Sequence, residues 1–203
     1  MRIITWNVHR ARKDNPVWDF LLRKEPDLVL LQEVGCMPSR VTDNFDYLTR
    51  PAINEAGSPQ KFQTGVLIKG KIGYWVVVGD FNSSETFDRE WQNRNGKRFS
   101  VRRSGDGEML RRMRGLGFTE SLRKSEQDPI IPTFRQSRGT IRHQIDHLFV
   151  SNNLIPVLEG CKVGDEATIL GKSLSDHLPI IADFTEPQAT THTQHSEKST
   201  WQT

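Results

Sequence analysis

The N-terminal part of the chain alternates between short apolar runs and polar turns. Residues 2–8 (RIITWNV) and 27–34 (DLVLLQEV) have the β-branched and aromatic content of buried strands. Between them apolar residues recur at helical spacing, Pro16 suits the first turn of a helix, and Pro26 ends it. A strand–helix–strand unit strongly favours parallel strands joined by a right-handed crossover. We therefore expect an α/β fold whose first two strands are parallel neighbours.

The middle of the chain is less regular. Residues 35–61 contain Gly, Pro, Asn and Ser and predict irregular surface structure, whereas GVLIK at 65–69 predicts a short strand. The next predicted strand, WVVVGDFN at 75–82, begins after a connection formed by residues 69–74. A connection of this length can make a hairpin turn, but it cannot hold a strand and a covering helix.

The C-terminal half predicts one helix and two further strands. The helix falls in 108–118, and the strands are QIDHLFVS at 144–151 and HLPIIADF at 177–184. We expect the apolar stripe of the helix to pack in the core; it comprises Met109, Leu110, Met113 and Leu116. The polar tail from 186 to 203 lacks apolar periodicity and is predicted to be disordered, which leaves residues 1–185 as one domain.

Polar side chains stand at one end of five of these strands, all except the strand at 65–69, and form five short motifs. In the early strands they follow the apolar run, and in the two late strands they precede it. If the late strands run antiparallel to the early ones, all five motifs meet at one edge of the sheets. The residues concerned are Asn7, Glu33, Asp80, Asn82, Asp146, Asp176 and His177.

Converging carboxylates repel one another unless a cation holds them together, so these motifs imply a divalent metal ion. Oxygen ligands suit Mg²⁺, or Mn²⁺, better than zinc. Each motif alone has an ordinary structural interpretation, since an Asp or Asn after a strand is usually a turn residue and a single His usually forms a structural hydrogen bond. Their coincidence at one edge favours a functional site.

Composition restricts the class of protein. With 203 residues, 35% of them hydrophobic and 26% charged, and with no apolar run long enough to cross a bilayer, the chain predicts a globular protein without membrane association. The N-terminus lacks the pattern of a secretory signal, so a cytoplasmic location is expected, and we expect a monomer. Cys36 and Cys161 offer neither a disulfide framework nor metal-ligand spacing.

Positive charge is concentrated between residues 88 and 124, a segment that contains eleven Lys and Arg residues and five Asp and Glu residues. Such a segment is compatible with a solvated surface. It also suits a polyanionic partner, because clustered cations release counterions when they neutralise phosphates. If the site described above acts on phosphate groups, this basic segment makes nucleic acid the expected substrate.

In order along the chain, the motifs W-N, Q-E, G-D-F-N, I-D-H and S-D-H-x-P-I resemble those of the endonuclease/exonuclease/phosphatase superfamily, over residues 3–184. The resemblance implies a deoxyribonuclease I-like fold, a four-layer β-sandwich of mixed sheets flanked by helices. It also implies a Mg²⁺-dependent phosphodiester hydrolase.

The same resemblance implies roles for the residues of the motifs. Glu33 would be the principal metal carboxylate, with Asn7 beside it and Asp176 as a further ligand. Asp80 would orient or deprotonate the attacking water, and Asn82 would donate to the scissile phosphate. His177 would donate to a phosphate oxygen while the Asp146 carboxylate holds it.

The chain departs from the family pattern at the short connection 69–74, where members normally carry another strand and helix. The predicted fold is therefore an α/β sandwich that lacks this internal segment. Three functions remain open: a nuclease acting on DNA or RNA, a phosphatase acting on a small phosphorylated substrate, and a shortened, catalytically impaired relative that only binds.

Overall fold

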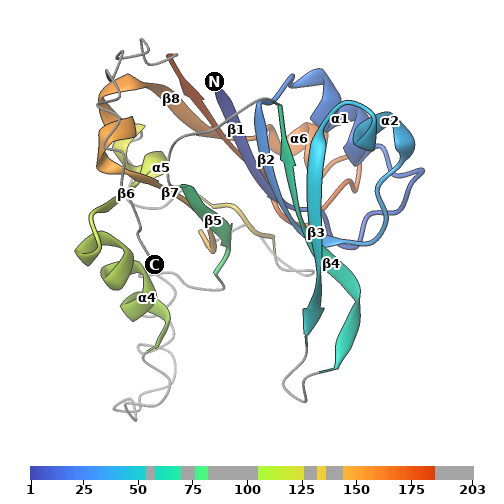
Figure 1. Cartoon of the computed structure of the whole chain (residues 1–203), viewed down its shortest axis with the longest axis horizontal. Helices are drawn as coiled ribbons and strands as arrows, with labels where there is room; N and C mark the ends of the chain where they lie inside the picture. The colour runs from blue at the N-terminus through green and yellow to red at the C-terminus, as the bar shows by residue number, and fades with distance from the viewer. Residues whose placement is uncertain (54–57, 70–75, 82–104, 126–131, 136–143, 186–203) are drawn as a thin grey trace, which may run out of the picture.

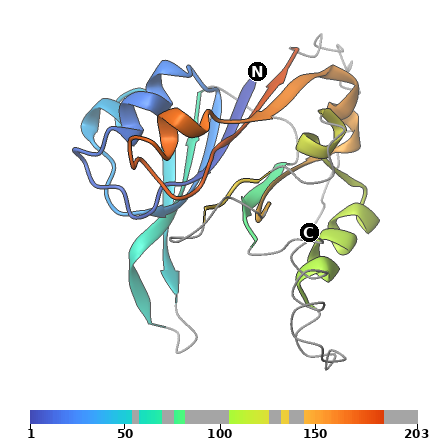
Figure 2. The ribbon, with the colours of Figure 1, turned by 180° about the vertical axis from the view of Figure 1, so that it is seen from behind.

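The computed structural model describes residues 1–53, 58–69, 76–81, 105–125, 132–135 and 144–185 (Figure 1). Asn82, the connection after Lys69, residues 88–104 of the basic segment and the predicted disordered tail lie outside these residues. Within the described part, helices and two β-sheets form four layers, as Figures 1 and 2 show from opposite sides. This is the α/β sandwich that the sequence predicts.

The larger sheet has six strands in the order β3-β4-β2-β1-β9-β8. The predicted parallel pair is confirmed, because β1 and β2 run parallel with Asn7 opposite Gln32. β9 runs antiparallel to β1, as the convergence of motifs requires. The strands are β1 (Arg2–Asn7), β2 (Leu28–Val34), β3 (Asp46–Ile53), β4 (Pro59–Ile68), β8 (Leu158–Val163) and β9 (Ile180–Phe184).

The prediction of irregular structure over 35–61 is wrong. That stretch contains the short helix α2 (Ser39–Thr42), strand β3 and the start of β4, which pairs antiparallel with β3. β3 is the edge strand of the sheet and most of its residues are exposed, so it lacks the apolar alternation that marks a buried strand. Pro51 lies within it, a position that an edge strand tolerates.

The smaller sheet has three strands among the described residues, in the order β5-β7-β6. β7 (Asp146–Ser151) lies between β5 (Val76–Asp80) and β6 (Phe118–Glu120) and is antiparallel to both. β4 and β5 therefore belong to different sheets and do not pair as a hairpin.

Apolar side chains fill both sides of the larger sheet. One cluster packs Ile4, Trp6 and Val29 against helix α1 (Val17–Arg23), which supplies Trp18, Phe20 and Leu21. The other lies between the sheets and includes Ile3, Leu148, Val150, Ile180 and Phe184. Alternate residues of β1 and β2 thus face opposite clusters, so Thr5, Asn7 and Gln32 are directed to the side that faces the smaller sheet.

Helix α4 (Gly105–Gly115) lies on the outer side of the smaller sheet (Figure 1). Leu110 and Met113 are buried there, but Met109 and Leu116 are exposed, so half of the predicted core stripe is wrong. The helix ends at Gly115, which leaves Leu116 beyond it, and Met109 faces away from the sheet. The remaining elements are α5 (Ser121–Ser125), the 3-10 helix η1 (Asn152–Val157) and α6 (Glu166–Ile169).

Both cysteines are thiols: Cys161 is buried in the core and Cys36 is exposed. None of the described helices combines the length and the apolar character needed to cross a bilayer.

Candidate active site

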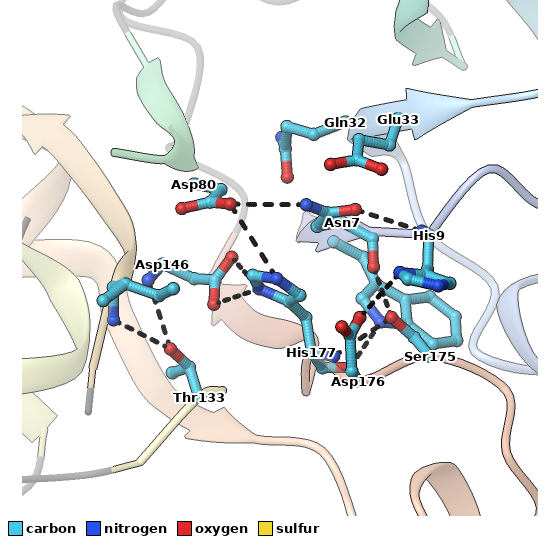
Figure 3. Close-up of polar contacts among 12 residues, drawn as sticks. Asn7, His9, Gln32, Glu33, Asp80, Thr133, Asp146, Ser175, Asp176 and His177 are labelled. Carbon is cyan, nitrogen blue, oxygen red and sulfur yellow. Dashed lines mark hydrogen bonds and ion pairs between the residues drawn. The ribbon is translucent and has the colours of Figure 1, made fainter. Parts of the chain in front are cut away.

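Strand ends from both sheets bring the polar motifs together at one edge of the sandwich, as Figure 3 shows. Asn7 ends β1 and Asp80 ends β5, while Asp146 begins β7 directly opposite Asp80 in the register. Asp176 and His177 lie in the segment before β9. Of the residues predicted for the site, Asn82 alone lies outside the described part of the chain.

His177 and Asp146 form a buried pair that joins the two sheets. The Nδ1 atom of His177 lies 3.1 and 2.9 Å from the two carboxylate oxygens of Asp146. The Asp146 backbone N–H donates to Thr133 Oγ1 over 3.1 Å, and the N–H of Ile145 donates to the same hydroxyl. Thr133 therefore holds the backbone of Asp146 in place, and the imidazole of His177 holds its carboxylate.

The surrounding charges favour the imidazolium form of His177. Burial by itself lowers the pKa of His177, but the hydrogen bond to Asp146 and the charges of Asp146, Asp80 and Asp176 together raise that pKa above 6.5. Burial also raises the pKa of Asp146, against the opposing effect of His177. Both Asp146 oxygens lie within hydrogen-bond distance of Nδ1, so the pair shares a proton between this nitrogen and the carboxylate.

Asp80 lies between this pair and Asn7. Its Oδ2 atom accepts a hydrogen bond from Asn7 Nδ2 over 3.3 Å and lies 3.8 Å from His177 Nε2 (Figure 3). Gly79, directly before it, has φ +152°, a conformation that L side chains rarely adopt, so glycine suits the point where β5 ends. A carboxylate, an amide and an imidazole thus face one another across the gap between the sheets.

Glu33 reaches the same side through an irregularity in β2. Strict alternation would direct Gln32 and Glu33 to opposite faces, but Glu33 has φ +50° and the pairing with β4 shifts register between Leu31 and Val34. In Figure 3 the side chains of Gln32 and Glu33 both lie on the side of Asn7. Glu33 Oε2 is 3.4 Å from Arg10 Nε.

The segment that carries Asp176 and His177 is anchored to β1. Trp6 Nε1 donates to the His177 carbonyl over 2.9 Å, and Ser175 Oγ donates to the Asn7 carbonyl over 2.7 Å. The His177 N–H in turn donates to Ser175 Oγ over 3.1 Å. The aromatic ring of Phe134 packs against the imidazole of His177, with ring centroids 4.8 Å apart. Rigid strands therefore position both site residues of this segment.

Two groups of side chains are suited to a metal ion. The ligand atoms of Asp80, Asp146 and His177 lie within 4.8 Å of one another. The predicted group, Asn7, Glu33 and Asp176, offers amide and carboxylate oxygens, which suit a hard divalent ion. Asp176 Oδ1 is shielded from solvent and forms no hydrogen bond among the described residues, and its ion-pair partner there is His9, whose Nδ1 lies 3.1 Å away. The predicted group therefore has the type of ligand atoms that such an ion takes.

Several residues of the site were not singled out from the sequence. Ser175 stands next to two predicted residues in the S-D-H motif, and its hydroxyl could have been included on that ground. Thr133 and His9 carry no sequence signal beyond being polar residues of loops. His9 nevertheless places Nδ1 only 3.1 Å from Asp176 Oδ1.

Some basic residues of the segment 88–124 form ion pairs with a buried carboxylate, while others are exposed on the surface. Arg123 and Arg114 approach the buried carboxylate of Glu120 at 3.0 and 3.8 Å. Glu120 also lies 2.7 Å from the buried imidazole of His147 and accepts from Gln144 over 2.5 Å. Part of the predicted positive charge is thus used inside the molecule, while Arg111 and Arg112 of α4 are exposed.

Fold and site together define a class: a two-sheet α/β sandwich with carboxylates, an amide and a His–Asp pair at one edge. A sequence profile of the Endonuclease/Exonuclease/phosphatase family matches residues 4–177. The chain belongs to this family, whose members are hydrolases. A search among curated proteins finds no match.

Solved structures with the same fold include proteins that act on DNA. The 3′ phosphatase NExo from Neisseria, bound to a product DNA hairpin, is 19% identical with a TM-score of 0.69, and the match covers 91% of this chain and 99% of that one. An AP endonuclease from Archaeoglobus fulgidus is 16% identical with a TM-score of 0.62 and the same coverage. TDP2 from Caenorhabditis elegans is 13% identical with a TM-score of 0.53, over 91% of this chain and 74% of that one. At these identities the likeness establishes the fold, which is deoxyribonuclease I-like.

Proposed function

We propose that the chain is a Mg²⁺-dependent phosphodiester hydrolase, a nuclease that cleaves DNA or RNA, with residues 1–185 as its catalytic domain. The observation that carries the proposal is the arrangement of His177, held by Asp146 and facing Asp80 at 3.8 Å. Hydrolysis of a phosphodiester needs a positioned water, charge neutralisation at the phosphoryl oxygens and help for the leaving oxygen. The site offers a group for each requirement.

His177 acts on the phosphate. With its pKa raised, the imidazole stays charged closer to neutrality and can donate from Nε2 to a phosphoryl oxygen. Asp146 keeps Nδ1 occupied and so fixes the orientation of the ring. Asn82, two residues after Asp80, would add a second donor to the same phosphate.

Asp80 acts on the water. Its carboxylate accepts a hydrogen bond from Asn7 Nδ2 over 3.3 Å and would orient the nucleophile or accept its proton. The distance to His177 Nε2 is long enough for a phosphate oxygen to approach the imidazole without breaking a short hydrogen bond.

Asn7, Glu33 and Asp176 would hold Mg²⁺ or Mn²⁺. When bound, the ion supplies positive charge that neutralises the phosphoryl oxygens. Among the described residues, the Asn7 amide oxygen accepts only the N–H of His9, over 3.0 Å. A carbonyl oxygen has two lone pairs, so it could also bind a metal ion.

Nucleic acid is the proposed substrate because basic residues accompany the site. Arg10 lies beside Glu33, and the Arg135 N–H donates to the Asp176 carbonyl over 2.9 Å, so both are near the site. The exposed arginines of α4 add positive charge on the outer side of the smaller sheet. The solved structures named above include a protein bound to a DNA hairpin, which supports the same substrate class. We propose that the enzyme acts as a monomer.

A phosphatase is the second candidate, since one of the structural neighbours is described as a 3′ phosphatase. The two are separated by incubating the protein with plasmid DNA, single-stranded DNA, RNA and small phosphomonoesters, in Mg²⁺ and in EDTA. Cleavage of a polymer that EDTA abolishes supports a nuclease. Release of inorganic phosphate with every polymer intact supports a phosphatase instead.

The short connection between β4 and β5 motivates a third outcome, a relative that binds without hydrolysis. A folded protein with a cooperative thermal transition, and no activity on any substrate of this panel, would contradict the proposed function and support this outcome.

A further inference from the structure

A buried imidazole lies behind the candidate active site, on the opposite face of the smaller sheet. His147 follows Asp146 in β7, and alternation along the strand directs the two side chains to opposite faces. Leu148 and Val150 pack between the two sheets, on the face of Asp146, whereas Phe149 packs in the outer cluster with α4, on the face of His147. The proposed hydrolysis assigns no role to this imidazole, although it is completely shielded from solvent.

The aromatic ring of Phe81 stacks on this imidazole. Phe81 directly follows Asp80, and its N–H donates to the Ile145 carbonyl over 3.0 Å. The ring centroids of Phe81 and His147 are 5.7 Å apart and the ring planes differ by 18°. Gly79 is directly opposite His147 in the register of β5 and β7, and it has no side chain that would separate the two rings.

The orientation of the imidazole is fixed by a buried carboxylate and a second ring. His147 Nδ1 lies 2.7 Å from Glu120 Oε1. Arg123 and Arg114 approach the other oxygen of the same carboxylate at 3.0 and 3.8 Å, so Glu120 is itself held. The Phe149 ring stacks on the imidazole as well, with centroids 6.0 Å apart. Phe81 therefore packs against a surface that is held from several sides.

Packing of the Phe81 ring fixes the end of β5, where the Asp80 carboxylate must be placed accurately. The two residues are neighbours, and their side chains project to opposite faces of the smaller sheet. On the inner face, Asp80 Oδ2 accepts from Asn7 Nδ2 over 3.3 Å and lies 3.8 Å from His177 Nε2. Gly79, on the other side of Asp80 in the chain, has no side chain to pack. A shift of the Phe81 ring would therefore move the carboxylate.

We propose that His147 is a positioning residue for the hydrolysis. Held by Glu120, its imidazole supports the Phe81 ring and so keeps the Asp80 carboxylate in place. The proposal rests on the proposed function, in which Asp80 acts on the attacking water. Misplacing a reacting group by about 1 Å can lower a rate by about 100-fold. His147 lies behind the sheet and not in the site, so its loss should lower kcat and leave KM unchanged.

Two substitutions of His147 separate its ring from its hydrogen bond. His147→Phe and His147→Leu both lose the contact with Glu120, but only Phe keeps a ring that can stack on Phe81. Val150→Ala is the matched control, because it truncates a buried side chain of the same strand on the opposite face. If thermal unfolding shows that His147→Leu does not fold, Phe81→Leu takes its place, since it removes the other ring of the stack.

The full-length variants are compared by two independent measurements. The first is kcat and KM for hydrolysis of nucleic acid in Mg²⁺. The second is the side-chain amide signal of Asn7 in ¹H–¹⁵N NMR spectra recorded without metal. Because Asn7 Nδ2 donates to Asp80 Oδ2, this signal reports the position of the Asp80 carboxylate whether or not the protein hydrolyses anything.

We expect His147→Leu to lower kcat by about 10–100-fold with KM unchanged, and to shift the Asn7 signal. His147→Phe and Val150→Ala should keep most of the wild-type kcat and an unshifted signal. Equal losses of kcat in His147→Phe and His147→Leu, or an Asn7 signal that His147→Leu leaves unshifted, would overturn the role of His147 while the proposed function stands. A wild type that hydrolyses nothing, together with a shifted Asn7 signal in His147→Leu, would contradict the proposed function but support the positioning of Asp80 by His147.

Discussion

His177 Nδ1 lies 2.9 Å from Asp146 Oδ2, although the two residues belong to segments that pair with different sheets. Asp146 is the first residue of β7 in the smaller sheet. His177 lies in the segment that leads into β9 of the larger sheet. The pair therefore forms only when the two sheets are packed face to face. The chemistry of the site and the assembly of the sandwich depend on the same contact.

The first prediction concerns the pH dependence of hydrolysis. The pKa of His177 is raised above 6.5, so the charged imidazole is present at low pH and is lost as the pH rises through the raised value. Asp146→Asn keeps the side-chain shape but removes the negative charge. The alkaline decline of kcat/KM on DNA should then move to lower pH and the maximum should fall, while Asp43→Asn, an exposed substitution, leaves the profile unchanged. A decline at the same pH in Asp146→Asn would contradict the role assigned to the pair.

The second prediction concerns the metal ion and the fold. A ligand that binds only the native state stabilises it, by about 2.7 kcal/mol at a concentration of one hundred times the dissociation constant. Mg²⁺ should therefore raise the thermal midpoint of the wild type, and Glu33→Gln should lose most of that increase. Glu25→Gln is the matched control, because Glu25 is exposed and also has a left-handed φ of +47°. Equal Mg²⁺ responses in the two variants would exclude Glu33 as a ligand.

The third prediction separates anchoring of the site from packing of the core. Trp6 and Trp18 are both buried in the same cluster, and each donates its indole N–H to a carbonyl: Trp6 to His177 and Trp18 to Arg12. Trp6→Phe and Trp18→Phe should each cost about 1–3 kcal/mol of unfolding free energy, measured in urea. Only Trp6→Phe should reduce kcat as well, because it releases the segment that positions His177. A similar loss of kcat in both variants would argue against a specific anchor.

The fourth prediction concerns the buried carboxylate of Glu120. Burial on its own raises the pKa of Glu120, but the hydrogen bond with His147 and the charges of His147, Arg123 and Arg114 bring it below 4.5. A lowered pKa gives stability that is present above 4.5 and is lost as the pH falls through the value in the folded protein. Glu120→Gln should cost about 3 kcal/mol at pH 7, because it removes the buried negative charge that Arg123, Arg114 and His147 surround.

Urea unfolding at neutral and at acid pH checks this prediction. The difference between the wild type and Glu120→Gln should shrink as the pH falls below 4.5, whereas Glu159→Gln, on the exposed side of β8, should match the wild type throughout. A difference that stays constant with pH would show that the charge of Glu120 contributes nothing to stability.

The arrangement of the first two strands and the meeting of the motifs were predictable because they follow from local patterns. Apolar runs that end in polar residues, a helix between two strands and a preference for right-handed crossovers are enough to bring Asn7 and Glu33 to one edge. Asp146 and His177 come before their strands instead of after them. They could therefore meet the other motifs only if these strands ran antiparallel to the early ones, and β7 and β9 do so.

What the sequence could not provide depends on contacts between distant segments. Edge strand β3 is mostly exposed and has no apolar alternation to reveal it. Glu33 reaches the site only through a shift in the pairing of β2 with β4, which no local pattern records. His9 reads as a polar turn residue until the turn places it beside Asp176. These features arise from backbone conformation fixed by tertiary packing, not from periodicity.

Asp80 faces both His177 and Asn7, and in the proposed function it acts on the attacking water. The most direct test measures cleavage of supercoiled plasmid in Mg²⁺ by the wild type and by Asp80→Asn, with thermal unfolding to show that both are folded. Removal of a general base lowers the rate by about 10²–10⁴-fold, so Asp80→Asn should be almost inactive while the wild type cleaves and EDTA stops it. Cleavage at the wild-type rate by Asp80→Asn would contradict the proposed role of Asp80 in hydrolysis.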